Sequence, residues 1–158
     1  MPGPEGNEMI DVVDKKTRSR MMSGIKGKDT KPELLVRKIL FKNGYRYKLH
    51  DKCLPGKPDL VLPKYNAVIF IHGCFWHGHD CHLFKWPSTR PDFWKNKINR
   101  NVEVDKMNCK KLKQEGWYIL TIWECALKGK GKLQDDDLME SIVSWLIYSK
   151  RDKTIRGK

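Results

Sequence analysis

Apolar residues recur at helical spacing in three stretches of the chain, and residues that start or stop a helix bound each stretch. The first follows Thr30-Lys31-Pro32-Glu33, a capping-box pattern with proline in the first turn, and it ends at Gly44. The second spans residues 92–115 before Gly116, and the third spans residues 135–149. The pattern therefore predicts three amphipathic helices.

Short apolar runs between these helices predict strands at residues 45–49, 59–62, 67–71 and 117–123. Turn chemistry between the second and third runs joins them as an antiparallel hairpin. A helix separates the third run from the fourth, so these two strands are expected to be parallel with a right-handed crossover. We therefore expect a single α/β domain with a small mixed central sheet flanked by helices.

The two ends of the chain lack this periodicity. We expect residues 1–13 to be a disordered tail and residues 150–158 to be a loose basic tail. Residues 14–29 form a basic arm at the start of the domain, which spans residues 14–149, and without a partner the arm is expected to be solvated and partly helical. The apolar side chains of the arm, which share one helical face, are Met21, Met22 and Ile25.

The charge balance narrows the class of partner. Lys and Arg number 32 against 19 Asp and Glu, which gives a formal net charge of +13 and a pI of about 9.6. Such a field attracts polyanions, so nucleic acid is the first candidate, although ribosomal and membrane-surface proteins share this balance. The N-terminal residues contain no apolar h-region, and no stretch approaches the ~20 apolar residues that cross a bilayer, so we expect a cytoplasmic location and no membrane partner. In that reducing compartment the five cysteines indicate metal ligands or buried thiols rather than disulfides.

Four Cys and His residues are expected to meet at one edge of the sheet. Cys74, His79 and Cys81 lie on the loop after the strand of residues 67–71, and Cys125 follows the neighbouring parallel strand. The carboxyl ends of parallel strands share an edge, and four ligands of this kind suit a tetrahedral, structural zinc ion. Buried thiols with surface histidines are the alternative, but a short loop without a core of its own favours a metal staple.

An acidic residue is expected at the same edge. If the hairpin is centred on its turn, Asp59 lies opposite Phe70 and Ile71. The order Pro58-Asp59, then Phe70-Ile71-His72, is similar to the PD-(D/E)xK nuclease plan, with Phe70 at the acidic position and His72 at the lysine position. An Asp after a turn is most often ordinary turn chemistry, but the predicted place of Asp59 beside the metal loop favours a catalytic role.

Phe75 and Trp76 stand among the expected metal ligands, and Trp94 begins a helix nearby. Large aromatic side chains on a polar loop either fold back into the core or meet an apolar surface of a partner. Core packing is the usual outcome for a lone ring, whereas two adjacent rings beside a basic edge make stacking on or between DNA bases a competing interpretation.

Several segments of the chain match one known family. They are Leu54-Pro55-Gly56-Lys57-Pro58-Asp59, Val68-Ile69-Phe70-Ile71-His72-Gly73-Cys74-Phe75-Trp76-His77, Phe84-Lys85, Thr89-Arg90, Asn101-Val102-Glu103 and Trp123-Glu124-Cys125-Ala126-Leu127. In these segments, and from about Asp14 to Trp145 as a whole, the chain resembles the very-short-patch repair (Vsr) mismatch endonucleases.

This resemblance implies a PD-(D/E)xK, restriction-endonuclease-like fold and a set of catalytic roles. Asp59 would bind Mg²⁺ together with the backbone carbonyl of Ile71, and His77 would be the general acid/base. Glu33 and His72 would support them. Ile71 replaces a threonine that is common in the family, so the carbonyl is kept and the hydroxyl is absent.

The resemblance also implies the contacts with zinc and DNA. The rings of Phe75, Trp76 and Trp94 would intercalate between bases. Met22 and Ile25 of the arm would enter the opposite groove, with Lys26 as a further DNA contact. The zinc ligands implied by the family are the four that the spacing indicates, namely Cys74, His79, Cys81 and Cys125, although Gly78 and Asp80 replace histidines of some members.

The function that follows is a Mg²⁺-dependent endonuclease of the bacterial cytoplasm and nucleoid that nicks one strand 5′ of the T in a T:G mismatch. Such mismatches arise when 5-methylcytosine deaminates, and the nick would start very-short-patch repair. A zinc-bearing, non-catalytic DNA-binding module and a restriction-type duplex cutter are the alternatives. We expect a monomer, because no extra apolar face suits a dimer, and the sequence leaves open whether a repair-pathway protein is a partner.

Overall fold

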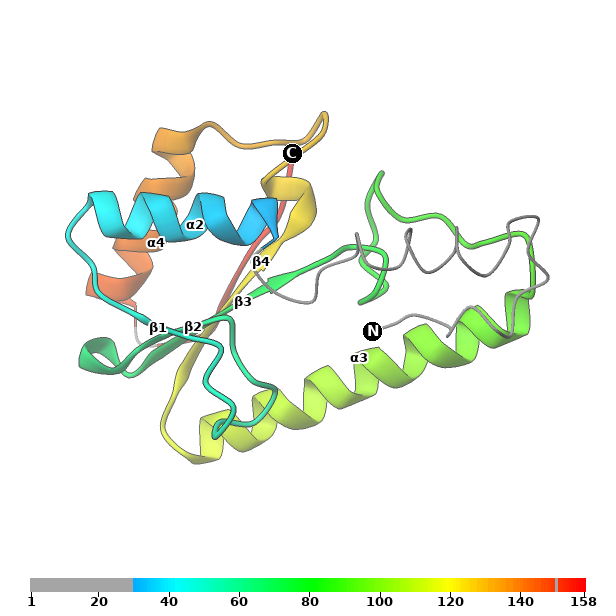
Figure 1. Cartoon of the computed structure of the whole chain (residues 1–158), viewed down its shortest axis with the longest axis horizontal. Coiled ribbons are helices and arrows are strands. Elements are labelled where there is room, and N and C mark those ends of the chain that lie inside the picture. Colours follow the sequence, from blue (N-terminus) through cyan, green and yellow to red (C-terminus); the bar gives the residue numbers. More distant parts are fainter. Residues whose placement is uncertain (1–29, 150) are drawn as a thin grey trace, which may run out of the picture.

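The computed structural model describes residues 30–149 and 151–158, which form a mixed five-stranded sheet with helices on both faces (Figure 1). The sheet follows the chain order β1-β2-β3-β4-β5. β2 is antiparallel to both β1 and β3, whereas β4 is parallel to β3 and β5 is parallel to β4. The strands are β1 (Lys48–Leu49), β2 (Leu60–Leu62), β3 (Ala67–His72), β4 (Tyr118–Trp123) and β5 (Lys153–Ile155).

Within the described residues, the α-helices begin and end close to the positions that the sequence predicts. They are α2 (Lys31–Lys42), α3 (Pro91–Gln114) and α4 (Asp135–Tyr148), and the short 3-10 turns η2 (Pro63–Tyr65) and η3 (Glu124–Ala126) follow β2 and β4. The Oγ1 of Thr30 accepts a hydrogen bond of 3.3 Å from the backbone N–H of Glu33, so Thr30 is the N-cap of α2.

The apolar residues form two cores, one on each face of the sheet. α2 and α4 lie side by side over one face, where Leu40 and Trp145 are almost fully buried (Figure 1). α3 covers the other face only with its C-terminal part, and its N-terminal half reaches beyond the sheet. The smaller core under α3 consists of Val61, Val68, Phe70, Leu112 and Ile119. The N-terminal half of α3 lies instead beside the loop that follows β3, to which Asn101 donates a hydrogen bond at the carbonyl of Trp76.

The predicted α/β class, the mixed sheet and the parallel pairing of β3 with β4 are confirmed. The predicted hairpin register is also confirmed, because Leu60 pairs with Ile69 and this places Asp59 opposite Phe70. The strand expected at residues 45–49 is shorter, since only Lys48 and Leu49 pair with β2.

The C-terminal residues depart from the prediction of a loose basic tail. Residues 153–155 form β5, and Ile155 is 5% exposed in the larger core. A run of three residues with one apolar side chain is too short to reveal a strand by periodicity. Pairing with the open edge of β4 decides its structure.

Candidate active site and Cys/His metal centre

Three groups of chemically reactive side chains gather at the edge where β3 and β4 end. Asp59 immediately precedes β2, which is antiparallel to β3, so it lies near the C-terminal end of β3. His72 is the last residue of β3, and Cys125 follows β4 in η3. The topology thus brings together residues that the sequence separates widely, as predicted.

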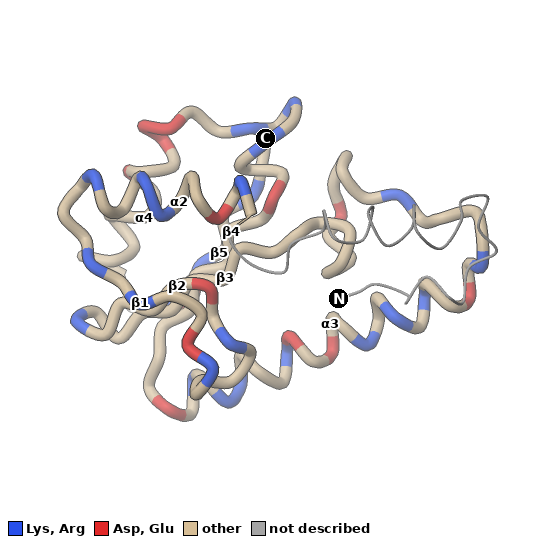
Figure 2. The backbone as a smooth tube through the Cα atoms, in the orientation of Figure 1, with Lys and Arg blue, Asp and Glu red and all other residues tan. Residues whose placement is uncertain are grey.

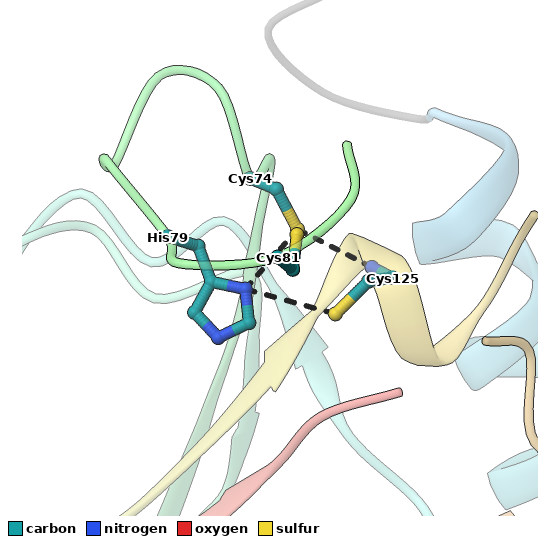
Figure 3. Close-up of side chains that lie close together, drawn as sticks. All are labelled: Cys74, His79, Cys81 and Cys125. Carbon is teal, nitrogen blue, oxygen red and sulfur yellow. Dashed lines mark hydrogen bonds between the residues drawn. The ribbon is translucent and has the colours of Figure 1, made fainter. Parts of the chain in front are cut away.

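The Cys/His centre consists of the four residues that the sequence predicts (Figure 3). Their ligand atoms all lie within 4.8 Å of one another. Cys74 and Cys125 are 0% and 1% exposed and His79 is 9% exposed. The four residues are Cys74, His79, Cys81 and Cys125.

The distances within this centre fit a tetrahedral metal ion. The Nδ1 of His79 lies 3.5 Å from the Sγ of Cys74 and 3.6 Å from the Sγ of Cys125. A tetrahedral zinc ion with bonds of about 2.3 Å to sulfur and about 2.0 Å to nitrogen needs nitrogen–sulfur separations of about 3.5 Å. Burial raises the pKa of the Cys74 thiol, so its thiolate needs a cation beside it, and burial lowers the pKa of His79, which favours the neutral imidazole that a metal ligand requires. Cys53 and Cys109 lie outside this centre.

The second group of reactive side chains consists of Glu33, His50 and Asp59. The Nε2 of His50 lies 2.9 Å from Oε2 of Glu33, and its Nδ1 lies 4.0 Å from Oδ1 of Asp59. The carboxylate of Glu33, which is 2% exposed, also forms a salt bridge with Arg37. The other oxygen of Asp59, Oδ2, accepts a hydrogen bond of 2.7 Å from the backbone N–H of Ile71.

The charge of Asp59 is held in unfavourable surroundings. Burial, reinforced by the nearby charge of Glu33, raises the pKa of Asp59 from 3.8 to about 6, although the hydrogen bond from Ile71 and the two nearby histidines act in the opposite direction. A cation bound beside this carboxylate would relieve both penalties. A carboxylate with a raised pKa in a pocket is a common feature of functional sites.

The third group is a pair of stacked histidines with one carboxylate. The rings of His72 and His77 lie 3.8 Å apart with an angle of 6° between their planes. The Nδ1 of His77 lies 2.5 Å from Oδ2 of Asp105, which comes from α3. Burial, and then the neighbouring His77, lower the pKa of His72 to about 3, so His72 is neutral at physiological pH.

Two hollows flank this histidine pair. The first, with a volume of about 240 Å³, is lined by Asp59, Ile71, His72, His77 and Asp105, and also by Lys57. The second, of about 450 Å³, lies between α3 and the strands β4 and β5 and shares both histidines and Asp105. Asp59 and His77 therefore face one common space, in which a phosphate group could meet both.

The predicted aromatic residues form one partly buried cluster beside the Cys/His centre. The ring of Phe75 lies 5.2 Å from Trp76 and 5.4 Å from Trp94, and the two tryptophans lie 5.9 Å apart. Phe84 extends the cluster at 5.8 Å from Phe75. The side chain of Asn101 fixes the loop by donating a hydrogen bond of 2.8 Å to the carbonyl of Trp76. The rings are partly buried and pack against one another, and stacking on DNA bases stays a prediction.

Trp123 connects the metal centre with the histidine pair. Its indole stacks on the ring of His79, with centroids 4.0 Å apart and planes at 9°. The same indole meets His72 edge-on at 5.3 Å. The metal loop and the catalytic candidates are thus packed as one unit.

Sequence reasoning missed three residues of this site. His50 had no assigned role. The pairing of Leu49 with Leu60 places His50 next to Asp59, and the antiparallel pairing of β1 with β2 is the signal that could have revealed this. Asp105 lies 28 residues from His77 and carries no local signal. Glu124 accepts a hydrogen bond of 3.1 Å from the backbone N–H of Cys74 and so ties the loop that begins at Cys74 to η3, the turn after β4.

Three of the predicted DNA contacts belong to the arm. Met22, Ile25 and Lys26 lie outside the described residues, as do the tail of residues 1–13 and the arm of residues 14–29. Among the described residues, no helix combines the length and the apolar character that a bilayer crossing requires.

Comparisons with known proteins agree with the geometry. The sequence profile of the family described as DNA mismatch endonuclease Vsr matches residues 10–83. The DNA mismatch endonuclease Vsr of Escherichia coli (strain K12) is 46% identical over 138 residues, which cover 87% of this chain and 88% of that protein.

Enzymes named for nicking rather than for mismatches are also similar to this chain. The Type II nicking enzyme V.NmeAIP of Neisseria meningitidis is 48% identical over 77% of this chain and 87% of its own length. The Type II nicking enzyme V.HpaIIP of Haemophilus parainfluenzae is 34% identical over 90% of this chain and 98% of its own length. These relatives imply a restriction-endonuclease-like fold and DNA as the substrate, and the chain belongs to the Vsr family of DNA endonucleases.

Proposed function

We propose that this endonuclease nicks one strand of duplex DNA on the 5′ side of the T in a T:G mismatch and so starts very-short-patch repair. The observation that carries the proposal is that Asp59 and His77 line one pocket at the sheet edge, next to a partly buried aromatic cluster. A relative named as a mismatch endonuclease and others named as nicking enzymes support both parts of the proposal, the mismatch and the single-strand cut.

Asp59 is the candidate ligand for Mg²⁺, together with the backbone carbonyl of Ile71. Carboxylate and carbonyl oxygens are the ligands that Mg²⁺ prefers, and the raised pKa of Asp59 indicates a charge that lacks compensation. Bound there, Mg²⁺ would polarise the phosphate and stabilise negative charge on the leaving oxygen. Glu33 and His50 keep Asp59 in place from the other side.

His77 is the candidate general base. Its Nδ1 is held by the carboxylate of Asp105, so in the neutral ring the proton lies on Nδ1 and Nε2 is the acceptor. Nε2 takes a proton from the water that attacks phosphorus, and the imidazolium that forms is stabilised by Asp105. The stacked ring of His72 stays neutral, so it positions the ring of His77 without repelling the positive charge that His77 gains.

The aromatic cluster is the candidate for mismatch selection. A mismatched step costs less to unstack than a paired one, so inserting Phe75, Trp76 and Trp94 is cheaper there. The Cys/His centre, which we assign to structural zinc with four ligands and no open position, would hold the loop that carries Phe75 and Trp76. We propose that the enzyme acts as a monomer and that a repair-pathway protein is an optional partner.

A second candidate function is nicking at a recognition sequence in fully paired DNA. The names of several relatives, which are Type II nicking enzymes, favour it. The catalytic residues would be the same, and only the substrate would differ.

A nicking assay distinguishes these candidates. Duplexes that are identical except for one central pair (T:G, T:A, C:G or another mismatch) carry a different label on each strand. We expect a single cut in the T strand of the T:G duplex, only when Mg²⁺ is added. Equal cutting of the paired duplexes would favour the sequence-directed function, and no cutting of any duplex would favour a non-catalytic DNA-binding module.

A further inference from the structure

The C-terminal segment, residues 153–158, lies directly against the Cys/His centre. β5 pairs with β4 up to Ile155, and the chain then continues past η3 (Figure 1). The backbone N–H of Gly157 donates a hydrogen bond of 3.3 Å to the Sγ of Cys125. The N–H of Lys158 donates a hydrogen bond of 3.0 Å to the carbonyl of Gly131. A segment far from the metal loop in the sequence thus contacts one of its ligand sulfurs.

Gly157 is at a position where only glycine fits without a shift. A Cβ atom there would lie 2.3 Å from the carbonyl oxygen of Cys125 and 2.8 Å from its carbonyl carbon. It would also lie 2.8 Å from the carbonyl oxygen of Gly131. These neighbours are backbone atoms that cannot rotate away, so a side chain at residue 157 must push the segment off the centre.

Arg156 ties the same segment to the other half of the centre. Its guanidinium donates a hydrogen bond of 2.6 Å to the carbonyl of Asp80, which lies between the ligands His79 and Cys81. The segment therefore contacts both the loop that supplies three ligands and the turn that supplies the fourth. Its buried anchor is Ile155, which is 5% exposed.

We propose that residues 153–158 form a C-terminal strap that retains the metal ion of the Cys/His centre. The N–H of Gly157 stabilises the thiolate charge of Cys125, Arg156 links the ligand loop to the strap, and together they restrict access of water and chelators to the metal. Partners of ligand atoms in other metal sites have a measurable effect of this kind, typically about 10–100-fold in metal affinity. The inference rests on the proposed zinc assignment and goes beyond it.

Docking of the strap and binding of the metal must stabilise each other. If the docked strap raises the equilibrium affinity for the metal, the bound metal must stabilise the docked strap by the same free energy. Removing the metal should therefore expose the backbone amides of residues 157 and 158 in the natural chain, without any substitution.

The first test measures zinc release from the purified holoprotein to a coloured chelator in excess. We expect Gly157→Ala and Arg156→Gln each to release zinc about tenfold faster or more. Lys158→Ala is the matched control, because the contacts of this neighbouring residue in the described part of the chain are made by its backbone, and it should release zinc at the natural rate. The Arg156→Gln variant leaves the tight backbone approach intact, so it reports on the strap even if Gly157→Ala does not fold.

The second test compares amide hydrogen exchange of residues 153–158 in the unsubstituted protein with zinc bound and after chelation. We expect faster exchange of the amides of residues 157 and 158 after chelation. Unsubstituted protein purified without zinc would overturn both the zinc assignment and the strap. Zinc-loaded protein with unchanged release in both variants and unchanged exchange would overturn the strap alone, and would leave the proposed nicking activity untouched.

Discussion

Asp59 lies in surroundings that favour its neutral acid over its carboxylate. Its side chain is 18% exposed and lies near Glu33, and these conditions raise its pKa to about 6. A raised pKa means that the folded protein favours the neutral acid. The negative charge that the proposed Mg²⁺ site needs is therefore maintained at a cost in folding stability, which one substitution can measure.

Asp59→Asn should stabilise the protein at neutral pH when no Mg²⁺ is present. The folded pKa is above the unfolded value of 3.8, so the destabilisation by the charge is fully present above about pH 6 and disappears as the pH falls towards 4. The amide keeps the size of the side chain, and we expect a gain of about 1–3 kcal/mol in unfolding free energy at pH 7.5. Urea unfolding of both proteins at pH 7.5 and pH 4.5 measures it. A gain that is equal at both pH values, or absent at pH 7.5, would show that the charge is not the cause.

The contact between His77 and Asp105 makes a second prediction at this scale. Asp105→Asn preserves an oxygen beside Nδ1 but removes the charge that stabilises the imidazolium, so nicking should slow by about 10–10³-fold while binding to a T:G duplex is retained. If the two residues act together, Asp105→Asn should add little to the loss already caused by His77→Ala. Single-turnover rates of the single and double variants test this, with Glu115→Gln at the end of the same helix as the control. Losses that multiply would indicate independent roles.

At the scale of elements, the sequence pattern predicted those helices and strands whose ends are set by neighbouring residues. The Thr30 cap, the strand of residues 67–71 and the long helix before Gly116 were all readable from spacing and turn residues. The Cys/His centre could also be predicted, because β3 and β4 had to be parallel neighbours and their ends had to meet. β5, Asp105 and Glu124 could not be predicted, since each acts through a contact made only in the folded chain.

The arm is an element that stays a prediction, because it lies outside the described residues. Its basic residues are Lys15, Lys16, Arg18, Arg20, Lys26 and Lys28. Removing residues 1–28 should weaken binding to duplex DNA and reduce the slope of log affinity against log salt by about 0.9 for each DNA phosphate that the arm neutralises. Removing only residues 1–13, which contain no Lys or Arg, is the control and should leave the slope unchanged. A slope that is also unchanged in the longer deletion would mean that the arm neutralises no phosphates.

At the scale of the whole molecule, the larger core and the candidate active site occupy different parts of the structure. The larger core joins α2, α4 and the sheet, whereas the metal loop, the histidine pair and the aromatic cluster all lie where α3 extends past the sheet. Lys and Arg are distributed along α3 (Figure 2), so the positive field of a molecule with a net charge of +13 extends to this edge. The positive field would therefore attract DNA to the edge where we propose that the chemistry occurs.

The most direct test of the account is single-turnover nicking of a T:G duplex by Asp59→Asn, with binding of the same duplex measured in parallel. The neutral amide is a weak ligand for Mg²⁺, so we expect nicking to fall by about 10³-fold or more while mismatch binding is retained. Ile71→Val is the matched control from the same pocket, because it keeps the backbone carbonyl and costs only about 0.5–1.5 kcal/mol in stability, and it should nick at a rate close to that of the unsubstituted protein. Nicking by Asp59→Asn at the unsubstituted rate would contradict the account, since the edge formed by β2, β3 and α3 would then not be the active site.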